Sequence, residues 1–184
     1  MKIYTRKGDD GTTGLLYGGR VPKDSAVIAA NGAVDEAQAS LGVARAAAEP
    51  GSELDEILVT VERDLYVLMA ELATAEGNRR KLQPGTSLVT AEMVDALEEH
   101  IDAITARFPP LTDFVIPGHD AVSAALDVAR TVVRRAERQA LGAAAGGSQV
   151  LPYLNRLSDL LWALARCQEH GESLLSKRVG NPSR

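Results

Sequence analysis

The first two dozen residues of the chain carry a set of groups suited to holding an anion. Within YTRKGDDGTTGLLYGGRVPK, residues 4–23, glycine recurs at every third position from Gly8 to Gly14, which lets the backbone approach a ligand and turn its N–H groups toward it. Hydroxyl and basic side chains add further donors: Thr5, Arg6, Lys7, Thr12, Thr13, Arg20 and Lys23. This set suits a polyphosphate, although the GxxxxGK[ST] pattern of a P-loop is absent. The alternative is a flexible tail rich in turn residues.

A second basic cluster has the sequence RTVVRRAER, within an acidic protein. At about 100° per residue in a helix, Arg130, Arg134 and Glu137 fall on one flank of the apolar stripe. Arg138 lies slightly further round that side, and Arg135 lies on the opposite flank. Arginines at the edge of a buried face, with one carboxylate among them, suit an anion site or a subunit contact. The alternative is a solvated face whose i,i+4 ion pairs contribute only about 0.3–0.5 kcal/mol each.

A third polar group follows at helical spacing: Asn155, Asp159, Trp162 and Arg166 are separated by four, three and four positions and therefore share one side of a helix. Asn155 can order a ribose or a base edge, or it can cap a buried turn. Trp162 is typical of core or interface packing.

The sequence offers no recognisable protein nucleophile or metal centre. The three histidines are scattered, no Glu-x-x-His or GxSxG motif occurs, and Cys167 is the only cysteine. A single cysteine excludes an internal disulfide framework, and Cys167 is either a small buried hydrophobic residue or a reactive thiol. If the protein is an enzyme, we expect the nucleophile to come from a substrate or a cofactor.

Helices must position these groups, because apolar residues recur at three- and four-residue steps along most of the chain. With 45% hydrophobic and only 4% aromatic residues, we expect one all-α domain, an antiparallel bundle of four to five helices. The helices are predicted over 25–48, 53–76, 90–107, 120–141 and 149–170. The domain then comprises an N-terminal loop (1–24), the bundle (25–170) and a weakly specified tail (171–184).

Charge and hydropathy argue against two classes of protein, those that bind nucleic acids and those that span a membrane. The net charge of -5 and the pI near 5.3 argue against nucleic-acid binding. The longest strongly apolar run, LLWALA, is much shorter than the roughly 20 residues that span a membrane. We therefore expect no membrane partner and a cytoplasmic location.

The motifs together resemble the PduO-type ATP:corrinoid adenosyltransferases. The segments that carry the resemblance, in order, are YTRKGDDGTTGL, RVPKD, AVDEAQASLG, FVIPG, VARTVVRRAERQ and LNRLSDLLWALAR. The resemblance implies a homotrimer of five-helix bundles with active sites between subunits. It also implies transfer of the 5′-deoxyadenosyl group of ATP to cob(I)alamin, giving adenosylcobalamin and triphosphate. Because Co(I) attacks the ribose C5′ itself, the protein supplies positioning and electrostatic stabilisation.

The resemblance also assigns residues to the ATP site. The matching positions in the N-terminal segment are Thr5, Arg6, Lys7, Gly8, Thr13, Gly14 and Lys23. Those in the later segments are Arg134, Arg135, Glu137, Arg138 and Asn155. We expect this N-terminal loop to become ordered when ATP binds.

The corrinoid side of the site is implied in the same way. Arg130 and Asp35 match a pair that bridges neighbouring subunits beside the active site, and Phe114 matches the aromatic residue that packs beneath the corrin ring and displaces its lower ligand. Trp162 stands where phenylalanine is common, and His119 where many relatives have a second glycine. The tail from 177 to 184 lacks the aromatic that some members fold over the corrinoid. These differences from the family pattern bear on corrinoid affinity more than on ATP binding.

Cofactors and partners follow from the same resemblance. Mg²⁺ is expected on the triphosphate, and K⁺ is a further candidate cation. A flavoprotein or other reductase and an adenosylcobalamin-dependent acceptor enzyme are the expected partners. Two other hypotheses stay open: a non-catalytic chaperone that delivers adenosylcobalamin, and a structural helical oligomer whose arginines make only subunit contacts.

Overall fold

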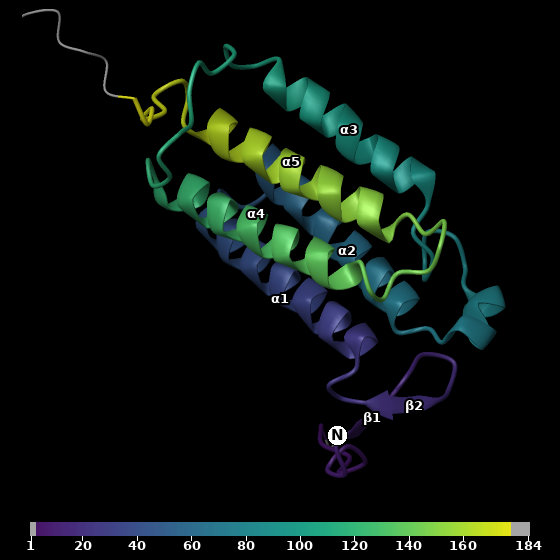
Figure 1. The fold of residues 1–184 in the computed structure, drawn as a ribbon. Helices are drawn as coiled ribbons and strands as arrows, with labels where there is room; N and C mark the ends of the chain where they lie inside the picture. Colours follow the sequence, from purple (N-terminus) through teal and green to yellow (C-terminus); the bar gives the residue numbers. More distant parts are fainter. Residues whose placement is uncertain (1–2, 178–184) are drawn as a thin grey trace, which may run out of the picture.

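Apolar stripes at helical spacing give the chain five α-helices over residues 3–177, the part that the computed structural model describes (Figure 1). The α-helices are α1 (Ala26–Ala47), α2 (Glu53–Leu72), α3 (Ala91–Thr105), α4 (Ala121–Ala140) and α5 (Val150–Gln168). A short 3-10 helix, η1 (Glu76–Lys81), follows α2, and two strands, β1 (Thr12–Gly14) and β2 (Arg20–Pro22), precede α1. The predicted all-α bundle is confirmed. Within residues 3–177 no helix is both long and apolar enough to cross a membrane.

Helix α4 lies at the centre of the packing, against α1 on one side and α5 on the other, while α2 packs on α1 and α3 on α5. The stripe predicted for the first helix is largely buried, since Ala30, Val34, Ala37, Leu41 and Ala44 are fully enclosed. Small alanines at these positions let the helix backbones come close together. Side-chain caps begin two of the helices: the side chains of Ser52 and Thr90 accept hydrogen bonds from the first turns of α2 and α3.

The second helix ends at Leu72 rather than at the predicted residue 76. The reason lies outside the helix, because the carbonyl of Ala73 accepts a hydrogen bond of 2.8 Å from the backbone N–H of Leu16 in the N-terminal segment. The chain after Leu72 therefore pairs with a distant segment instead of continuing the helix. The stretch between α2 and α3, where no helix was predicted beyond residue 76, contains η1.

The N-terminal segment forms a β-hairpin rather than an irregular loop. Strands β1 and β2 pair antiparallel with Thr13 opposite Val21. Asn78 of η1 donates to the carbonyl of Tyr17 at 3.3 Å, and the Tyr17 hydroxyl lies 3.3 Å from Ser87 Oγ. The hairpin is thus attached to the end of the bundle where α2 finishes and α1 begins (Figure 1).

A buried carboxylate holds this end of the bundle together. Glu71 is 1% exposed and accepts hydrogen bonds from the Arg79 guanidinium (2.8 Å), the Val89 N–H (2.8 Å) and the Ser148 hydroxyl (2.6 Å). These donors come from η1, the segment before α3 and the α4–α5 loop. Because a buried charge is tolerated only when it is paired and hydrogen-bonded, Glu71 fixes the relative positions of three segments that are distant in the sequence.

A second buried polar contact joins α5 to α2. The Tyr153 ring is fully enclosed, and its hydroxyl donates to Asp64 Oδ2 at 2.9 Å. Burial raises the pKa of the Asp64 carboxyl above its ordinary value of 3.8, and the hydrogen bond from Tyr153 offsets part of that rise. Burial together with the nearby Asp64 charge raises the pKa of Tyr153, so its hydroxyl stays a donor.

We predict that Asp64→Asn flattens the pH dependence of stability. Folded Asp64 holds its proton more tightly than the unfolded chain does, so the contribution of Asp64 to stability is fully present below the unfolded pKa and is lost as pH rises through the folded pKa. Asparagine keeps an acceptor for the Tyr153 hydroxyl and removes the titration. Thermal unfolding from about pH 4 to about pH 7 should show a smaller decline in the variant. Asp95→Asn, on the exposed face of α3, is the control, and a decline in Asp64→Asn equal to that of wild type would contradict the prediction.

Candidate functional site

The predicted N-terminal anion site lies on the hairpin and the turn before it. Arg20 donates to the Thr12 hydroxyl (3.0 Å from Nε) and to the backbone carbonyl of Lys7, so its charge serves to hold the turn onto the hairpin. Lys23 crosses over Gly8: a Cβ at Gly8 would lie 3.1 Å from Lys23 Nζ. Glycine at this position therefore allows the ammonium group to lie directly against the turn. The other predicted residues here, Thr5, Arg6, Lys7, Thr13 and Gly14, lie on the same turn or on β1.

The second predicted anion site lies along the exposed edge where α4 meets α5. Asn155 Nδ2 donates to Glu137 Oε1 at 3.1 Å, and Asn155 Oδ1 accepts from Arg156 at 2.7 Å. Arg138 Nη1 donates to the carbonyl of Arg134 at 3.0 Å. The structure thus places Asn155 beside Glu137, with the exposed side chains of Arg134 and Arg138 along the same edge. Glu137 departs from the alternative of an i,i+4 paired face, because it bonds across to Asn155 of α5, whereas Arg134 and Arg138 are exposed on the surface of α4.

Arg135 lies apart from this group. It forms an ion pair with Glu36 of α1, which is the opposite flank of α4, as the helical spacing predicted. Within the described chain, therefore, Arg135 does not join Asn155 and Glu137.

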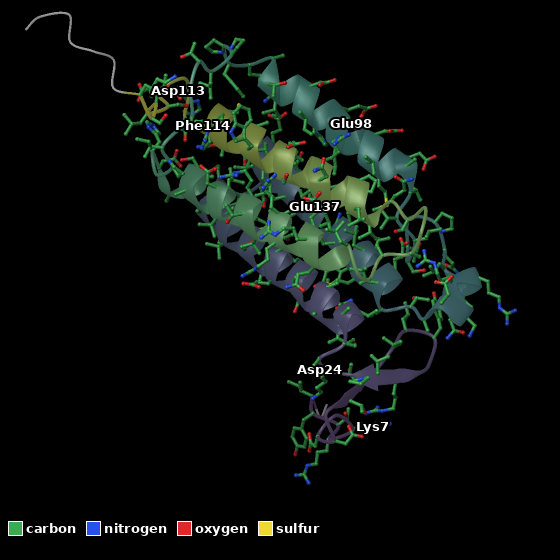
Figure 2. All side chains as sticks on the ribbon, in the orientation of Figure 1. Lys7, Asp24, Glu98, Asp113, Phe114 and Glu137 are labelled. Carbon is green, nitrogen blue, oxygen red and sulfur yellow. The ribbon has the colours of Figure 1, made fainter. Side chains whose placement is uncertain are left out.

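The two predicted halves of the ATP site are separated within one chain. Lys7 on the hairpin segment lies beyond the end of the bundle, apart from Glu137, which lies in the last turn of α4 (Figure 2). Phe114 lies at the other end of the molecule from Lys7 (Figure 2). A ligand that touched the hairpin and the α4 edge together would need these groups from different copies of the chain or a large rearrangement.

A cavity of about 670 Å³ opens between the loop before α4 and the facing sides of α4 and α5. Its lining includes Phe114, Arg130, Trp162, Arg166 and Lys177, and its size is within the range of ligand-binding clefts. Phe114 is 84% exposed, which is unusual for a phenylalanine that serves only as core packing. Trp162 packs edge-on against Phe108 with ring centroids 6.1 Å apart while still lining the cavity, so it combines packing with a place in the site.

The Phe114 loop is held by the segment that follows α5. The Ile116 N–H donates to the carbonyl of Leu174, and the Ser176 N–H donates to the carbonyl of Phe114, both at 2.8 Å. The Phe114 N–H, together with Lys177 and Ser176, holds the pKa of the Asp113 carboxyl below its ordinary value. Residues 178–184 of the predicted tail lie outside the described residues.

Beneath the cavity is a buried ion cluster that sequence reasoning missed. Arg166, expected on a polar face, is only 3% exposed and bonds Asp127 Oδ2 at 2.6 Å and Glu169 Oε1 at 2.8 Å. The other oxygen of Asp127 binds Arg130 Nε at 3.0 Å. No pattern in the sequence indicated it, because at about 100° per residue Asp127 falls outside the apolar stripe of α4, on the flank that carries Arg130 and Arg134.

Comparison with known proteins gives matches over most of the chain. Residues 3–168 match the family described as cobalamin adenosyltransferase. The corrinoid adenosyltransferase of Mycobacterium tuberculosis (strain H37Rv) is 45% identical over 170 residues, which cover 90% of this chain and 87% of that protein.

The chain belongs to the cobalamin adenosyltransferase family.

Two solved structures from Lactobacillus reuteri share the fold of this cobalamin adenosyltransferase family member. One is a phenylalanine-to-alanine variant of a PduO-type ATP:corrinoid adenosyltransferase complexed with cobalamin and ATP, with a TM-score of 0.84, 31% identity, and coverage of 96% of this chain and 100% of that one. The other is an arginine-to-lysine variant complexed with ATP, with a TM-score of 0.82, 30% identity, and coverage of 95% and 100%.

Asp35 and Arg130, the predicted pair, form no salt bridge with each other within one chain, among the described residues. Asp35 is exposed on α1, whereas the salt-bridge partner of Arg130 among residues 3–177 is Asp127.

His119, which stands where many relatives have a second glycine after the Pro-Gly pair, lies 3.9 Å from Glu172. Cys167, for which the sequence left a packing role and a reactive thiol open, is half-buried.

We predict that Arg166→Met destabilises the protein by about 3–5 kcal/mol, because it leaves the buried carboxylates of Asp127 and Glu169 without their shared cation. Urea unfolding at a fixed protein concentration measures the loss. Arg107→Met is the matched control: its partner Glu53 is exposed, so its transition should stay close to that of wild type. Equal transitions for the two variants would show that the cluster is not coupled to folding.

Proposed function

We propose that this protein transfers the 5′-deoxyadenosyl group of ATP to cob(I)alamin, producing adenosylcobalamin and triphosphate. One observation carries the proposal: Arg130 lines the Phe114 cavity, and Arg134, one helical turn further along α4, lies on the edge shared with Asn155. One turn is about 5.4 Å. A single helix therefore brings a cationic edge suited to a nucleotide next to a cavity in which Phe114 and Trp162 offer apolar surface to a corrin face.

The proposed chemistry needs no nucleophile from the protein. The Co(I) electron pair forms the Co–C5′ bond as the C5′–O bond breaks, and that bonding pair leaves with the triphosphate. The arginines of α4 and Lys23 of the hairpin stabilise the charge that grows on the leaving group. Phe114, held outward over the cavity, excludes a lower ligand from cobalt, which makes the reduction of Co(II) easier.

The active site is proposed to form between subunits of a homotrimer. The separation of the hairpin from the α4 edge within one chain (Figure 2) supports this arrangement, and so does the exposed position of Asp35, which is free to meet Arg130 of a neighbouring copy. Among residues 3–177 no cluster of three or more acidic, histidine or cysteine side chains forms a metal site. The Mg²⁺ in this proposal accordingly arrives on the phosphate oxygens of ATP, and K⁺ is a further candidate cation.

The same proposal includes a reductase, an acceptor enzyme and a cellular compartment. A flavoprotein or another reductase supplies the electron that yields Co(I), and an adenosylcobalamin-dependent enzyme accepts the product. The cytoplasm is the proposed compartment, since it keeps Cys167 and the cobalt reduced.

The test is an anaerobic assay with MgATP and chemically reduced cob(I)alamin, in which absorbance follows Co–C bond formation. We predict that Arg134→Ala raises the KM for ATP at least about tenfold, because a charge-assisted hydrogen bond to phosphate is lost. Arg107→Ala, an exposed arginine beside Glu53, is the control and should keep the wild-type KM. Absence of product from the wild-type protein with excess ATP would overturn the proposed reaction, and binding without turnover would instead favour a delivery chaperone.

Mixed trimers test the location of the site. Lys23→Ala removes a hairpin cation, and Arg134→Ala removes an α4 cation, so each homotrimer should be weak. If each site takes its hairpin and its α4 edge from different subunits, random 1:1 co-assembly restores about a quarter of the sites. Activity of the co-expressed mixture, compared with each variant alone, measures the recovery. No recovery in verified mixed trimers would place both halves of the site in one subunit.

A further inference from the structure

The buried cluster at the Phe114 end of the bundle links two parts of the site that have no direct bond to each other. Arg166 bonds both Asp127 and Glu169 through a single nitrogen, Nη2. Among the described residues its Nε has no hydrogen-bond partner. The position of this guanidinium is therefore set by the two carboxylates, and any displacement of one carboxylate is passed to the other.

The Asp127 side of the cluster leads to Arg130. The Asp127 carboxylate is shared, with Oδ2 on Arg166 and Oδ1 on Arg130. Asp127 is 4% exposed, whereas the Arg130 side chain is 26% exposed and lines the cavity. Asp127 therefore holds the partly exposed Arg130 from the buried side, through its Nε.

The Glu169 side leads to the Phe114 loop. Glu169 is fully buried and accepts a hydrogen bond from the Ser173 hydroxyl. Directly after Ser173, the chain pairs with the Phe114 loop through the bonds of Ile116 to Leu174 and of Ser176 to Phe114. The Ser173 hydroxyl is thus the one side-chain link, within residues 3–177, between the buried cluster and the segment that supports Phe114.

We propose that Arg166 is a positioning residue that couples Arg130 to the Phe114 loop. This inference rests on the proposed function, because it concerns how the two ends of the corrin-facing cavity keep their spacing. Through Asp127 the Arg166 guanidinium orients Arg130. Through Glu169 and Ser173 it fixes the position of the Phe114 loop. The four charged groups are two arginines and two carboxylates, so the coupling adds no net charge beneath the cavity.

Removing Arg166 itself is a poor test, since the variant leaves two buried carboxylates unpaired and folding is affected. Ser173→Ala instead removes only the hydroxyl link and leaves the ion cluster intact. Asp127→Asn keeps the shape of the side chain but removes the charge shared by the two arginines. Ser40→Ala is the matched control, because the Ser40 hydroxyl donates only to Ala37 within α1.

Steady-state rates are compared with cob(I)alamin and with cob(II)alamin plus a reductant. We expect Ser173→Ala to lose at least about tenfold in rate from Co(II), the low end for a lost hydrogen bond to a charged group, with an unchanged rate from Co(I). The spectroscopic signal of four-coordinate Co(II) should fall with it. Asp127→Asn should lower both rates, and Ser40→Ala neither. A purely structural role would change the amount of folded protein but not the ratio of the two rates, so an unchanged ratio in Ser173→Ala overturns the inference.

A measurement without substrates separates this inference from the proposed function. Amide hydrogen exchange at Ile116 reports its bond to Leu174, and we expect faster exchange in Ser173→Ala than in wild type or Ser40→Ala. Equal exchange in all three proteins overturns the coupling even if the wild type is active. Faster exchange combined with a wild type that makes no adenosylcobalamin supports the coupling and overturns the proposed reaction instead.

Discussion

Helix α4 must bury two flanks at once, one against α1 and the other against α5, and this constraint determines where its charges can lie. Leu126, Ala129, Val133, Ala136 and Ala140 of its inner face are fully enclosed, so its arginines are confined to the boundaries of the two contacts. At a boundary an arginine can keep its stem on apolar surface while its head reaches water or a ligand. The same geometry sends Arg135 to Glu36 on the α1 side and places Glu137 beside Asn155 on the α5 side. One packing requirement thus separates structural arginines from those that remain exposed for a ligand.

The two buried ion clusters stabilise opposite ends of the molecule. Glu71 joins η1, the segment before α3 and the α4–α5 loop at the hairpin end, whereas Arg166 joins α4 to the residues after α5 at the Phe114 end. Hydrophobic burial is non-directional, so it packs helices well but does not set the register of short loops. Charged hydrogen bonds with fixed geometry supply that register.

The helical part of the fold was predictable from the sequence because helix packing is a local pattern repeated along each element. Val34, Leu41 and Leu58 fall on stripes whose period needs no knowledge of the rest of the chain. The end of α2 was predicted wrongly because a hydrogen bond from Leu16 decides it, and that partner is more than fifty residues away. The hairpin was missed for a similar reason, since its strands are too short to show an alternating pattern. The candidate site residues were named through family motifs. The burial of Glu71 and Arg166 escaped that reasoning because neither belongs to an apolar stripe, and each is buried by partners that are distant in the sequence, such as Ser148 for Glu71 and Asp127 for Arg166.

The buried cluster around Arg166 is not explained by stability alone. Well-packed hydrophobic residues in place of a buried ion pair are often as stable or more stable, so a bundle selected only for folding has no need of this arginine. A guanidinium differs from an apolar side chain in two ways: it does not lose its proton in a protein, and its donors lie in a fixed plane. Asp127 and Glu169 must therefore stay at fixed positions around it whatever occupies the cavity above. A leucine at the same place would fill the volume, but it would leave the Arg130 side chain and the chain after α5 free to move independently. The cluster provides directional constraint at the point where α4, α5 and the Phe114 loop meet, and that is the property a cavity between separate segments needs.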